Sequence, residues 1–149
     1  DLEGLVMKLK TTHFGIIDIN EEELIDFPEG LPGFENVKKY ALIGHDAGGS
    51  PFFWLQSADN PELCFVVTDP FLVYDNYGVD VSDDDVKFLQ ITNANKVITL
   101  AITVIPEDVK KTRVNLKAPI LINTGKKLGK QVIQKDDTLP IRYFLFQNY

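Results

Sequence analysis

The sequence predicts an all-β protein, an antiparallel β-barrel or sandwich of about ten short strands with one short helix near residues 83–90. Three observations predict this class. Short runs rich in Val, Ile, Thr and aromatic residues recur along the chain. Gly, Pro, Asn and Asp separate these runs at close spacing, and these residues favour turns. The regular alternation of strands with long helical stretches that a parallel α/β fold requires is missing.

The apolar stretch of residues 51–74 predicts the central hairpin. It contains the only Trp, the only Cys and four of the ten Phe residues of the chain. Residues 52–56 and 63–68 have strand composition, and residues 57–61 between them have turn chemistry. Because both strands are apolar, we expect other strands to flank them. Residues 71–74 are expected to continue as a short extended segment after Asp69 and Pro70 end the second strand.

Four strands are predicted before this hairpin, of which the first two form a strand pair or one bent strand. The loop at residues 28–34 contains two Pro and two Gly, which predicts a fixed irregular shape with Leu31 and Phe34 turned inward. A second loop is predicted at residues 45–50, and Gly15 is a candidate β-bulge. The predicted strands cover residues 8–12, 14–19, 25–27 and 40–43.

One helix and five further strands are predicted after the hairpin, with another short alternating run at residues 79–81. Ser82 can cap the helix, and the three carboxylates that follow it suit the positive end of the helix dipole. Val86 and Leu89 give the helix an inward stripe. The five strands are predicted at residues 97–105, 112–116, 118–123, 129–134 and 141–146.

Length and composition predict one domain over residues 7–149, with residues 1–6 an N-terminal extension or a remnant of the expression vector. A single Cys excludes an intramolecular disulfide, and its apolar surroundings favour burial over reactivity. We find neither an apolar run long enough to span a membrane nor a secretory signal. The expected location is the cytoplasm.

Charge is unevenly distributed along the chain. Residues 1–90 carry 18 acidic and 5 basic side chains, whereas residues 91–149 carry 4 acidic and 10 basic side chains. The net charge of −7 does not suit direct nucleic-acid binding, which needs clustered Lys and Arg. Acidic residues gathered on one face would suit a basic protein partner. The alternative is that they only keep the protein soluble. The basic stretch at residues 110–130 has no predicted role.

Catalytic motifs are weak or incomplete, so we predict no enzyme, no metal and no cofactor. The Gly and Lys residues at 125–131 lack the spacing, the Ser or Thr and the following helix of a phosphate-binding loop. His13 and His45 lack the spacing of a zinc site. Cys64 would need a nearby His and an electropositive helix start to act as a nucleophile.

Five segments occur together in the order and at the spacing of one family. The chain resembles the bacterial flagellar assembly factor FliW over about residues 7–142. The segments are FPEGLPGF at 27–34, SPFFWLQS at 50–57, PELCFVVTDPFLVY at 61–74, VNLKAPILIN at 114–123 and GKQVI at 129–133.

The resemblance implies a non-enzymatic regulator with a β-barrel-like fold and two protein partners. One partner is CsrA, a dimeric RNA-binding repressor of flagellin translation, and the other is flagellin itself. Flagellin that accumulates occupies the FliW protein and leaves CsrA free to repress, whereas secretion of flagellin reverses the switch. The resemblance leaves open whether the two partners share one site.

The predicted partner-binding surface follows the central hairpin, where aromatic rings alternate with carboxylates. In the alternative interpretation, the rings belong to the core and the carboxylates only cap the helix. Two alternative functions are a small-ligand-binding β-barrel and a thiol enzyme that uses Cys64 and a His. The candidate partner-binding residues are Phe71, Tyr74, Asp75, Tyr77, Asp80, Asp83, Asp84 and Asp85.

Overall fold

The computed structural model describes residues 6–44 and 50–146, which form eleven strands, two short α-helices and three 3-10 turns. The helical elements are α1 (Pro70–Val73), α2 (Asp83–Phe88), η2 (Glu21–Glu23), η3 (Ala94–Lys96) and η4 (Val109–Lys111). The strands are β1 (Val6–Thr11), β2 (Gly15–Asn20), β3 (Ile25–Asp26), β4 (Lys39–Ile43), β5 (Phe52–Ser57), β6 (Cys64–Thr68), β7 (Val97–Val104), β8 (Arg113–Val114), β9 (Ile120–Asn123), β10 (Leu128–Gln131) and β11 (Tyr143–Phe144).

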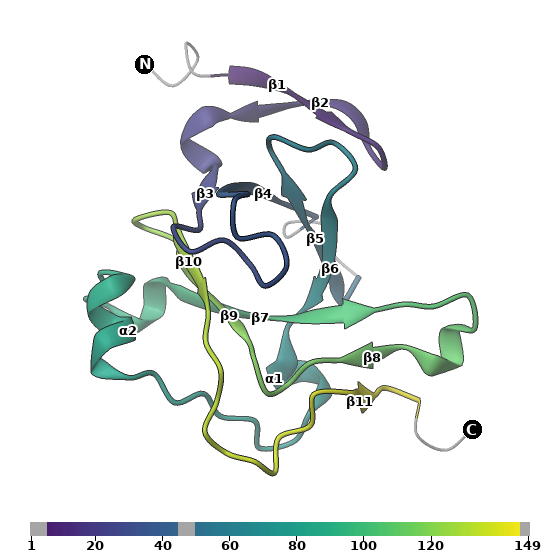
Figure 1. The fold of residues 1–149 in the computed structure, drawn as a ribbon, viewed down its shortest axis with the longest axis vertical. Coiled ribbons are helices and arrows are strands. Elements are labelled where there is room, and N and C mark those ends of the chain that lie inside the picture. The colour runs from purple at the N-terminus through teal and green to yellow at the C-terminus, as the bar shows by residue number, and fades with distance from the viewer. Residues whose placement is uncertain (1–5, 45–49, 147–149) are drawn as a thin grey trace.

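Seven strands close into a barrel, which confirms the predicted all-β class (Figure 1). Their order is β7, β6, β5, β4, β3, β10 and β9, and pairing of β9 with β7 completes the ring. One pair departs from the antiparallel prediction, because β10 runs parallel to β3 at Leu128 and Asp26. Closure leaves these strands without the exposed edges that an open sheet would have.

The predicted central hairpin is confirmed as β5 and β6, which lie between β4 and β7. Its turn is held by Ser57, whose Oγ accepts hydrogen bonds from the backbone N–H groups of Asp59 and Asn60 at 3.1 and 2.9 Å. The buried amide of Gln56 donates to the backbone oxygens of Ser57 and Pro61 at 3.1 and 3.2 Å. Polar side chains therefore fix the turn from both sides.

The barrel interior is filled by side chains. Phe27 and Tyr40 are fully buried and meet edge to face with ring centroids 5.3 Å apart. Gly129 makes room for this pair, because a Cβ at that position would lie 2.5 Å from the Phe27 ring. The other fully or almost fully buried members of this core are Ile25, Leu31, Leu55, Val67, Leu100, Ile120 and Ile122.

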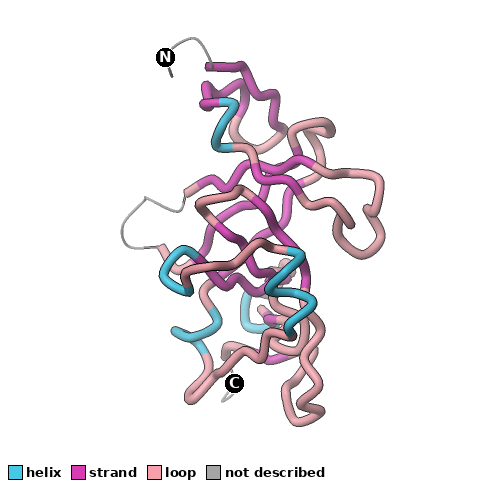
Figure 2. Tube along the Cα trace, turned by 90° about the vertical axis from the view of Figure 1, so that its left-hand side faces the viewer, coloured by secondary structure: helices cyan, strands magenta, loops and turns pink. Residues whose placement is uncertain are grey.

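The first two strands form a separate hairpin at one end of the molecule (Figures 1 and 2). The predicted strand pair is confirmed, and β1 begins at Val6, inside the range that the sequence analysis set aside. Gly15 is not a bulge, since it pairs with Thr11 and closes the turn with φ of +67°. The hairpin contacts the barrel through Phe14, whose ring meets that of Trp54 edge to face at 5.4 Å.

Beyond the barrel, β7 continues into a three-stranded ribbon with β8 and β11 (Figure 1). Thr103 of β7 pairs with Val114 of β8, which in turn pairs with Tyr143 of β11. Strands β8 and β11 are both shorter than predicted, covering two residues each where five and six were expected. We call β7, β8 and β11 together with their neighbouring loop residues 105–112 the ribbon.

The prediction of an extended segment at residues 71–74 is wrong, because Pro70–Val73 form α1. Asp69 caps this turn by accepting a hydrogen bond from the Phe71 N–H at 2.9 Å, and Pro70 occupies its first position. Pro suits this position because its missing N–H would have no partner there. Residues 79–81 form no strand either.

The Pro- and Gly-rich loop at residues 28–34 is partly as predicted. Leu31 is buried in the barrel core, whereas Phe34 is exposed at its edge and packs edge to face on Phe65 with centroids 5.7 Å apart. Of the second predicted loop, residues 45–49 lie outside the described residues. The predicted helix is confirmed as α2, and Ser82 caps it by accepting from the Asp85 N–H at 3.1 Å.

Candidate functional site

The segment of residues 70–90, which includes α1 and α2, carries the candidate partner-binding residues below and beside the barrel (Figure 1). Gln134, which is buried, holds its middle by bonding both backbone groups of Asp80. Asn123 of β9 holds its far end, donating from Nδ2 to the carbonyl oxygens of Leu89 and Gln90 at 2.8 and 3.1 Å. The segment is irregular but fixed at both points.

Tyr77 is a core residue, which corrects its place among the candidate contacts. Its side chain is 7% exposed, and its hydroxyl donates to the Leu116 carbonyl at 2.7 Å. The rings of Phe71 and Tyr74 pack edge to face on it, with centroids 5.4 and 6.2 Å away. Burial raises the pKa of Tyr77 to about 12, so the hydroxyl stays protonated and donates.

Asp85 is also removed from the candidate contacts. It is 8% exposed, and its Oδ1 lies 2.5 Å from Lys130 Nζ on β10. The hydrogen bond from Lys130 to Asp85 is the main reason that the pKa of Lys130 is raised. The Lys130 ammonium also lies 5.0 Å from the centroid of the Phe88 ring. This ion pair fastens α2 to the barrel.

The other six candidate residues lie at the surface. Phe71 is 50% exposed although one edge meets Tyr77, and Tyr74 is half-buried against Tyr143 at 5.0 Å. Asp83 and Asp84 are exposed in the first turn of α2. We call this set the acidic-aromatic surface, which consists of Phe71, Tyr74, Asp75, Asp80, Asp83 and Asp84.

Three further residues lie at the acidic-aromatic surface although the sequence did not indicate them. Asp136 and Thr138 line a hollow of about 420 Å³ together with Tyr74, Asp75 and Asp80. The Thr138 hydroxyl and backbone N–H donate to Asp136, and these bonds lower the pKa of its carboxyl. Asp136 thus adds a third carboxylate to Asp75 and Asp80. Leu72, 75% exposed on α1, adds apolar surface, and no local pattern had marked it.

An apolar groove of about 440 Å³ adjoins the acidic-aromatic surface. Phe71 belongs to both, and Val86 brings the groove to the first turn of α2, where Asp83 and Asp84 are exposed. The groove therefore has an apolar floor and carboxylates at one rim. Its lining residues are Phe71, Val79, Val81, Val86, Ile91, Ala94, Val97, Thr99 and Leu121.

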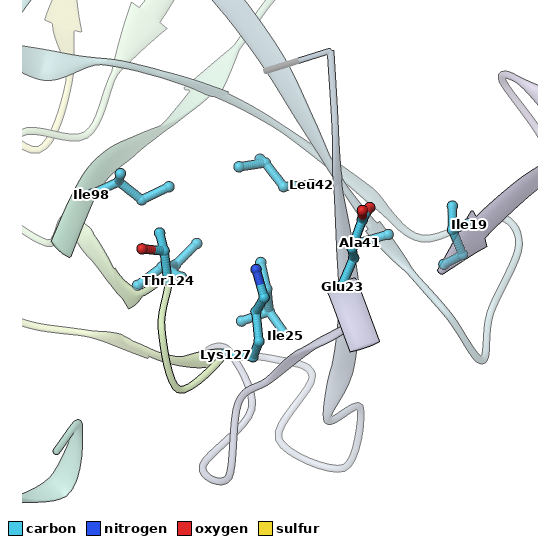
Figure 3. Close-up of a pocket in the computed structure, with 9 residues that line it drawn as sticks. Ile19, Glu23, Ile25, Ala41, Leu42, Ile98, Thr124 and Lys127 are labelled. Atoms are coloured by element: carbon cyan, nitrogen blue, oxygen red, sulfur yellow. The ribbon is translucent and has the colours of Figure 1, made fainter. Parts of the chain in front are cut away.

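A second concave site, a cleft of about 270 Å³, lies between β2, β4 and β7 (Figure 3). Ile98, Thr124 and Lys127 line one side, and Ile19, Glu23 and Ala41 line the other (Figure 3). The Lys127 ammonium and the Glu23 carboxylate are the two charged groups that could orient a small polar ligand in this cleft. Ile25 and Ile122 also line the cleft, so it borders the barrel core.

Cys64 and His13 line one shallow hollow of about 280 Å³ with Phe14, Trp54 and Val66. Burial raises the pKa of the Cys64 thiol to about 11, so the thiolate that nucleophilic catalysis needs is scarce at neutral pH. Among the described residues, no hydrogen bond joins the thiol to the imidazole. The two groups share a hollow without the arrangement of an activated nucleophile.

The described ranges, 6–44 and 50–146, contain no group of three or more His, Cys, Asp and Glu side chains arranged to hold a metal ion. Within the same ranges, no helix is long and apolar enough to cross a membrane.

The fold and its surfaces define a small β-barrel protein with a packed interior, whose exposed aromatic and acidic groups gather beside an apolar groove. The chain belongs to the FliW family, since the model described as "FliW protein" matches residues 8–145. Members of this family are flagellar assembly factors.

Curated relatives and a solved structure agree with this assignment. The chain is 47% identical over 135 residues to the flagellar assembly factor FliW of Caldicellulosiruptor saccharolyticus, covering 91% of this chain and 88% of the relative. It is 46% identical over 140 residues to that of Caldicellulosiruptor bescii, covering 94% and 91%. A crystal structure of the flagellar assembly factor FliW matches with a TM-score of 0.86 and 36% identity, covering 94% and 97%.

Proposed function

We propose that the protein binds the RNA-binding repressor CsrA and thereby relieves repression of flagellin mRNA, and that it binds flagellin in a partner-switching loop. In this role it acts in the cytoplasm and catalyses no reaction. One observation carries the proposal: exposed aromatic side chains and carboxylates lie together beside an apolar groove.

The acidic-aromatic surface suits CsrA because a protein that binds RNA needs a basic surface. Four carboxylates are exposed on one connected segment, so their negative electrostatic potentials reinforce one another. They are Asp75, Asp80, Asp83 and Asp84. Complementary charge speeds association, and a bound acidic protein disfavours RNA on its partner. Phe71 supplies the apolar anchor that such an interface needs at its centre.

The apolar groove suits flagellin if a helical end of flagellin presents an apolar face to it. Phe71 and Val86 lie where the groove meets the acidic-aromatic surface. A partner in the groove and a partner on that surface would therefore compete for Phe71. We propose that this overlap makes the two complexes mutually exclusive.

Calorimetric titration of CsrA into three variants tests the first partner. Phe71→Ala removes the anchor, and Asp83→Asn with Asp84→Asn removes two charges without touching the buried Asp85. We expect each of these variants to bind about tenfold more weakly, and the charge variant to lose its deficit at high salt. The matched control is Glu21→Gln with Glu22→Gln, which removes two exposed charges on η2, outside the acidic-aromatic surface.

The groove is tested with flagellin in the same assay. Val81→Lys and Ile91→Lys each place a charge at the groove while leaving the exposed aspartates unchanged. We expect flagellin binding to fall at least tenfold and CsrA binding to change less. Wild-type affinity of all variants for both partners would exclude this face as the binding site.

The small-ligand alternative has weaker support. The barrel interior is packed with large side chains, so a ligand would have to use the cleft that borders the core beside Glu23 and Lys127. That cleft has only two charged groups to orient a ligand. Protein partners remain the function that the surfaces support best.

A further inference from the structure

The ribbon has one covered face and one exposed face, in register across three strands. Thr103, Val114 and Tyr143 form one cross-strand row, and Val114 is fully buried in that row. The next row, one residue along each strand, consists of Val104, Arg113 and Phe144. Successive side chains point to opposite faces of a sheet, so this second row lies on the outer face. Val104 is 43% exposed and Phe144 is 41% exposed.

The last strand repeats this alternation. Tyr143 and Leu145 pack against the core cluster around Tyr77, whereas Arg142, Phe144 and Phe146 are exposed. The outer face therefore presents apolar and cationic side chains in turn. Ile141 and Val109 add exposed apolar surface at its margin. This alternation is typical of a strand that has one face packed on the core and the other face exposed.

The ribbon also ends in an open edge within the described part of the chain, since β11 is the terminal strand of its sheet. The Leu145 N–H donates to the Thr112 carbonyl at 3.0 Å, which fixes the alternation of the ladder. Because ladder bonds face the partner strand at every second residue, the N–H and C=O of Phe144 point away from β8. An added strand would find both groups there.

Cationic side chains outnumber acidic ones at the ribbon, whose loop also carries Glu107 and Asp108. Lys110, Lys111 and Arg142 line a hollow of about 500 Å³ with Phe144 and Phe146. Among the described residues, Lys111, Arg113 and Arg142 form no ion pair with a carboxylate. The edge is thus cationic in a protein whose net charge is −7. Two copies joined edge to edge would bring like charges together, which protects the edge from self-association.

We propose that the β11 edge and the outer face of the ribbon bind an acidic protein segment in extended form, as an added strand. Main-chain bonds to Phe144 would give affinity, and alternate side chains would meet the apolar and cationic groups of the outer face. Lys111, Arg113 and Arg142 favour an acidic segment. Single-stranded RNA could stack on Phe144 and Phe146, but RNA would leave the outward-facing main-chain groups of Phe144 without a strand partner, so the open edge favours a peptide.

This surface is distinct from the acidic-aromatic surface, and the inference does not depend on the proposed function. The two surfaces have opposite charge and involve different exposed residues. The protein could therefore hold a basic partner and an acidic segment at the same time.

Fluorescence anisotropy with the full chain tests the proposal. The probe is a short labelled peptide in which Glu alternates with Val and Thr, compared with the same peptide carrying Lys for Glu and with oligouridine. We expect only the acidic peptide to bind, at least tenfold more weakly to Lys111→Glu/Arg142→Glu. The control Lys126→Glu/Lys135→Glu makes the same change of charge at two exposed lysines elsewhere and should keep wild-type affinity.

Amide hydrogen exchange measures the added strand directly. The Phe144 N–H should become protected when the acidic peptide binds, and the protection should be absent with the Lys peptide. Equal affinity of both double variants, an unprotected Phe144 amide or tighter binding of oligouridine would each overturn the proposal. Thermal unfolding of both double variants checks that they fold.

Discussion

Asp85 Oδ1 accepts a hydrogen bond from Lys130 Nζ at 2.5 Å, so the third aspartate of the α2 first turn faces β10 while its two neighbours face solvent. Three consecutive carboxylates thus have two different roles. Asp83 and Asp84 contribute to the surface field, and Asp85 attaches the helix to the barrel. The distinction makes it possible to vary stability and surface charge separately.

The ion pair predicts unequal effects for neighbouring substitutions. Asp85→Asn should lower the free energy of unfolding by about 1–3 kcal/mol, because it leaves the partly buried Lys130 ammonium with only the Glu29 carboxylate, at 4.0 Å. The control Asp84→Asn, at an exposed position, should change it by less than about 0.5 kcal/mol. Urea denaturation at pH 7 measures both. Equal effects would show that the pair adds nothing.

The same pair predicts a pH dependence. The pKa of Lys130 is raised in the folded state, so its contribution is complete below the ordinary Lys value of 10.5 and is lost as pH rises through the folded value. Lys130→Met should therefore be less stable than wild type at pH 8, with a smaller deficit at strongly alkaline pH. Urea midpoints at several pH values measure the difference. A constant deficit across this range would contradict the assignment.

Tyr77→Phe should separate stability from binding. It removes the hydroxyl that donates to the Leu116 carbonyl at 2.7 Å while keeping the ring between Phe71 and Tyr74. We expect a loss of about 1–2 kcal/mol in unfolding free energy and no loss of CsrA affinity. Phe71→Ala should show the reverse balance, with weaker binding and a smaller loss of stability. Loss of CsrA affinity in a folded Tyr77→Phe protein would contradict this division.

Gly129→Ala should destabilise the barrel by about 1–3 kcal/mol. The new methyl group would lie 2.5 Å from the buried Phe27 ring, which cannot move without displacing Tyr40. Gly125→Ala is the matched control, since its Cβ would lie at an ordinary 3.5 Å from the Asn123 side chain. Thermal melts of the two variants should differ by several degrees.

Cys64 should behave as a partly buried thiol that is not activated. Its folded pKa of about 11 lies above the ordinary value of 9.0, so its contribution to stability is present below pH 9 and is lost between about pH 9 and 11. Cys64→Ala should lack this component. Rapid modification of the native thiol by a disulfide reagent at pH 8 would show instead that it is activated.

Local sequence determined much of the fold. The β-branched and aromatic runs produced β5, β6 and β7 close to their predicted bounds, because such side chains fit a buried pleated surface. Ser82 and the aspartates after it determined the start of α2. The Asp69–Pro70 pair also carried a helix-start signal, which the apolar residues after it obscured.

Only the tertiary structure decided which members of the candidate surface remain exposed. Tyr77 is buried because Leu116, 39 residues away, offers a carbonyl to its hydroxyl. Asp85 is paired because β10 brings Lys130 beneath α2, and Asp136 joins Asp75 and Asp80 through the C-terminal loop. The local sequence predicts which residues tend to be buried and which carry charge. The space and the partner for each side chain come from segments far along the chain, so they are set only when the barrel closes.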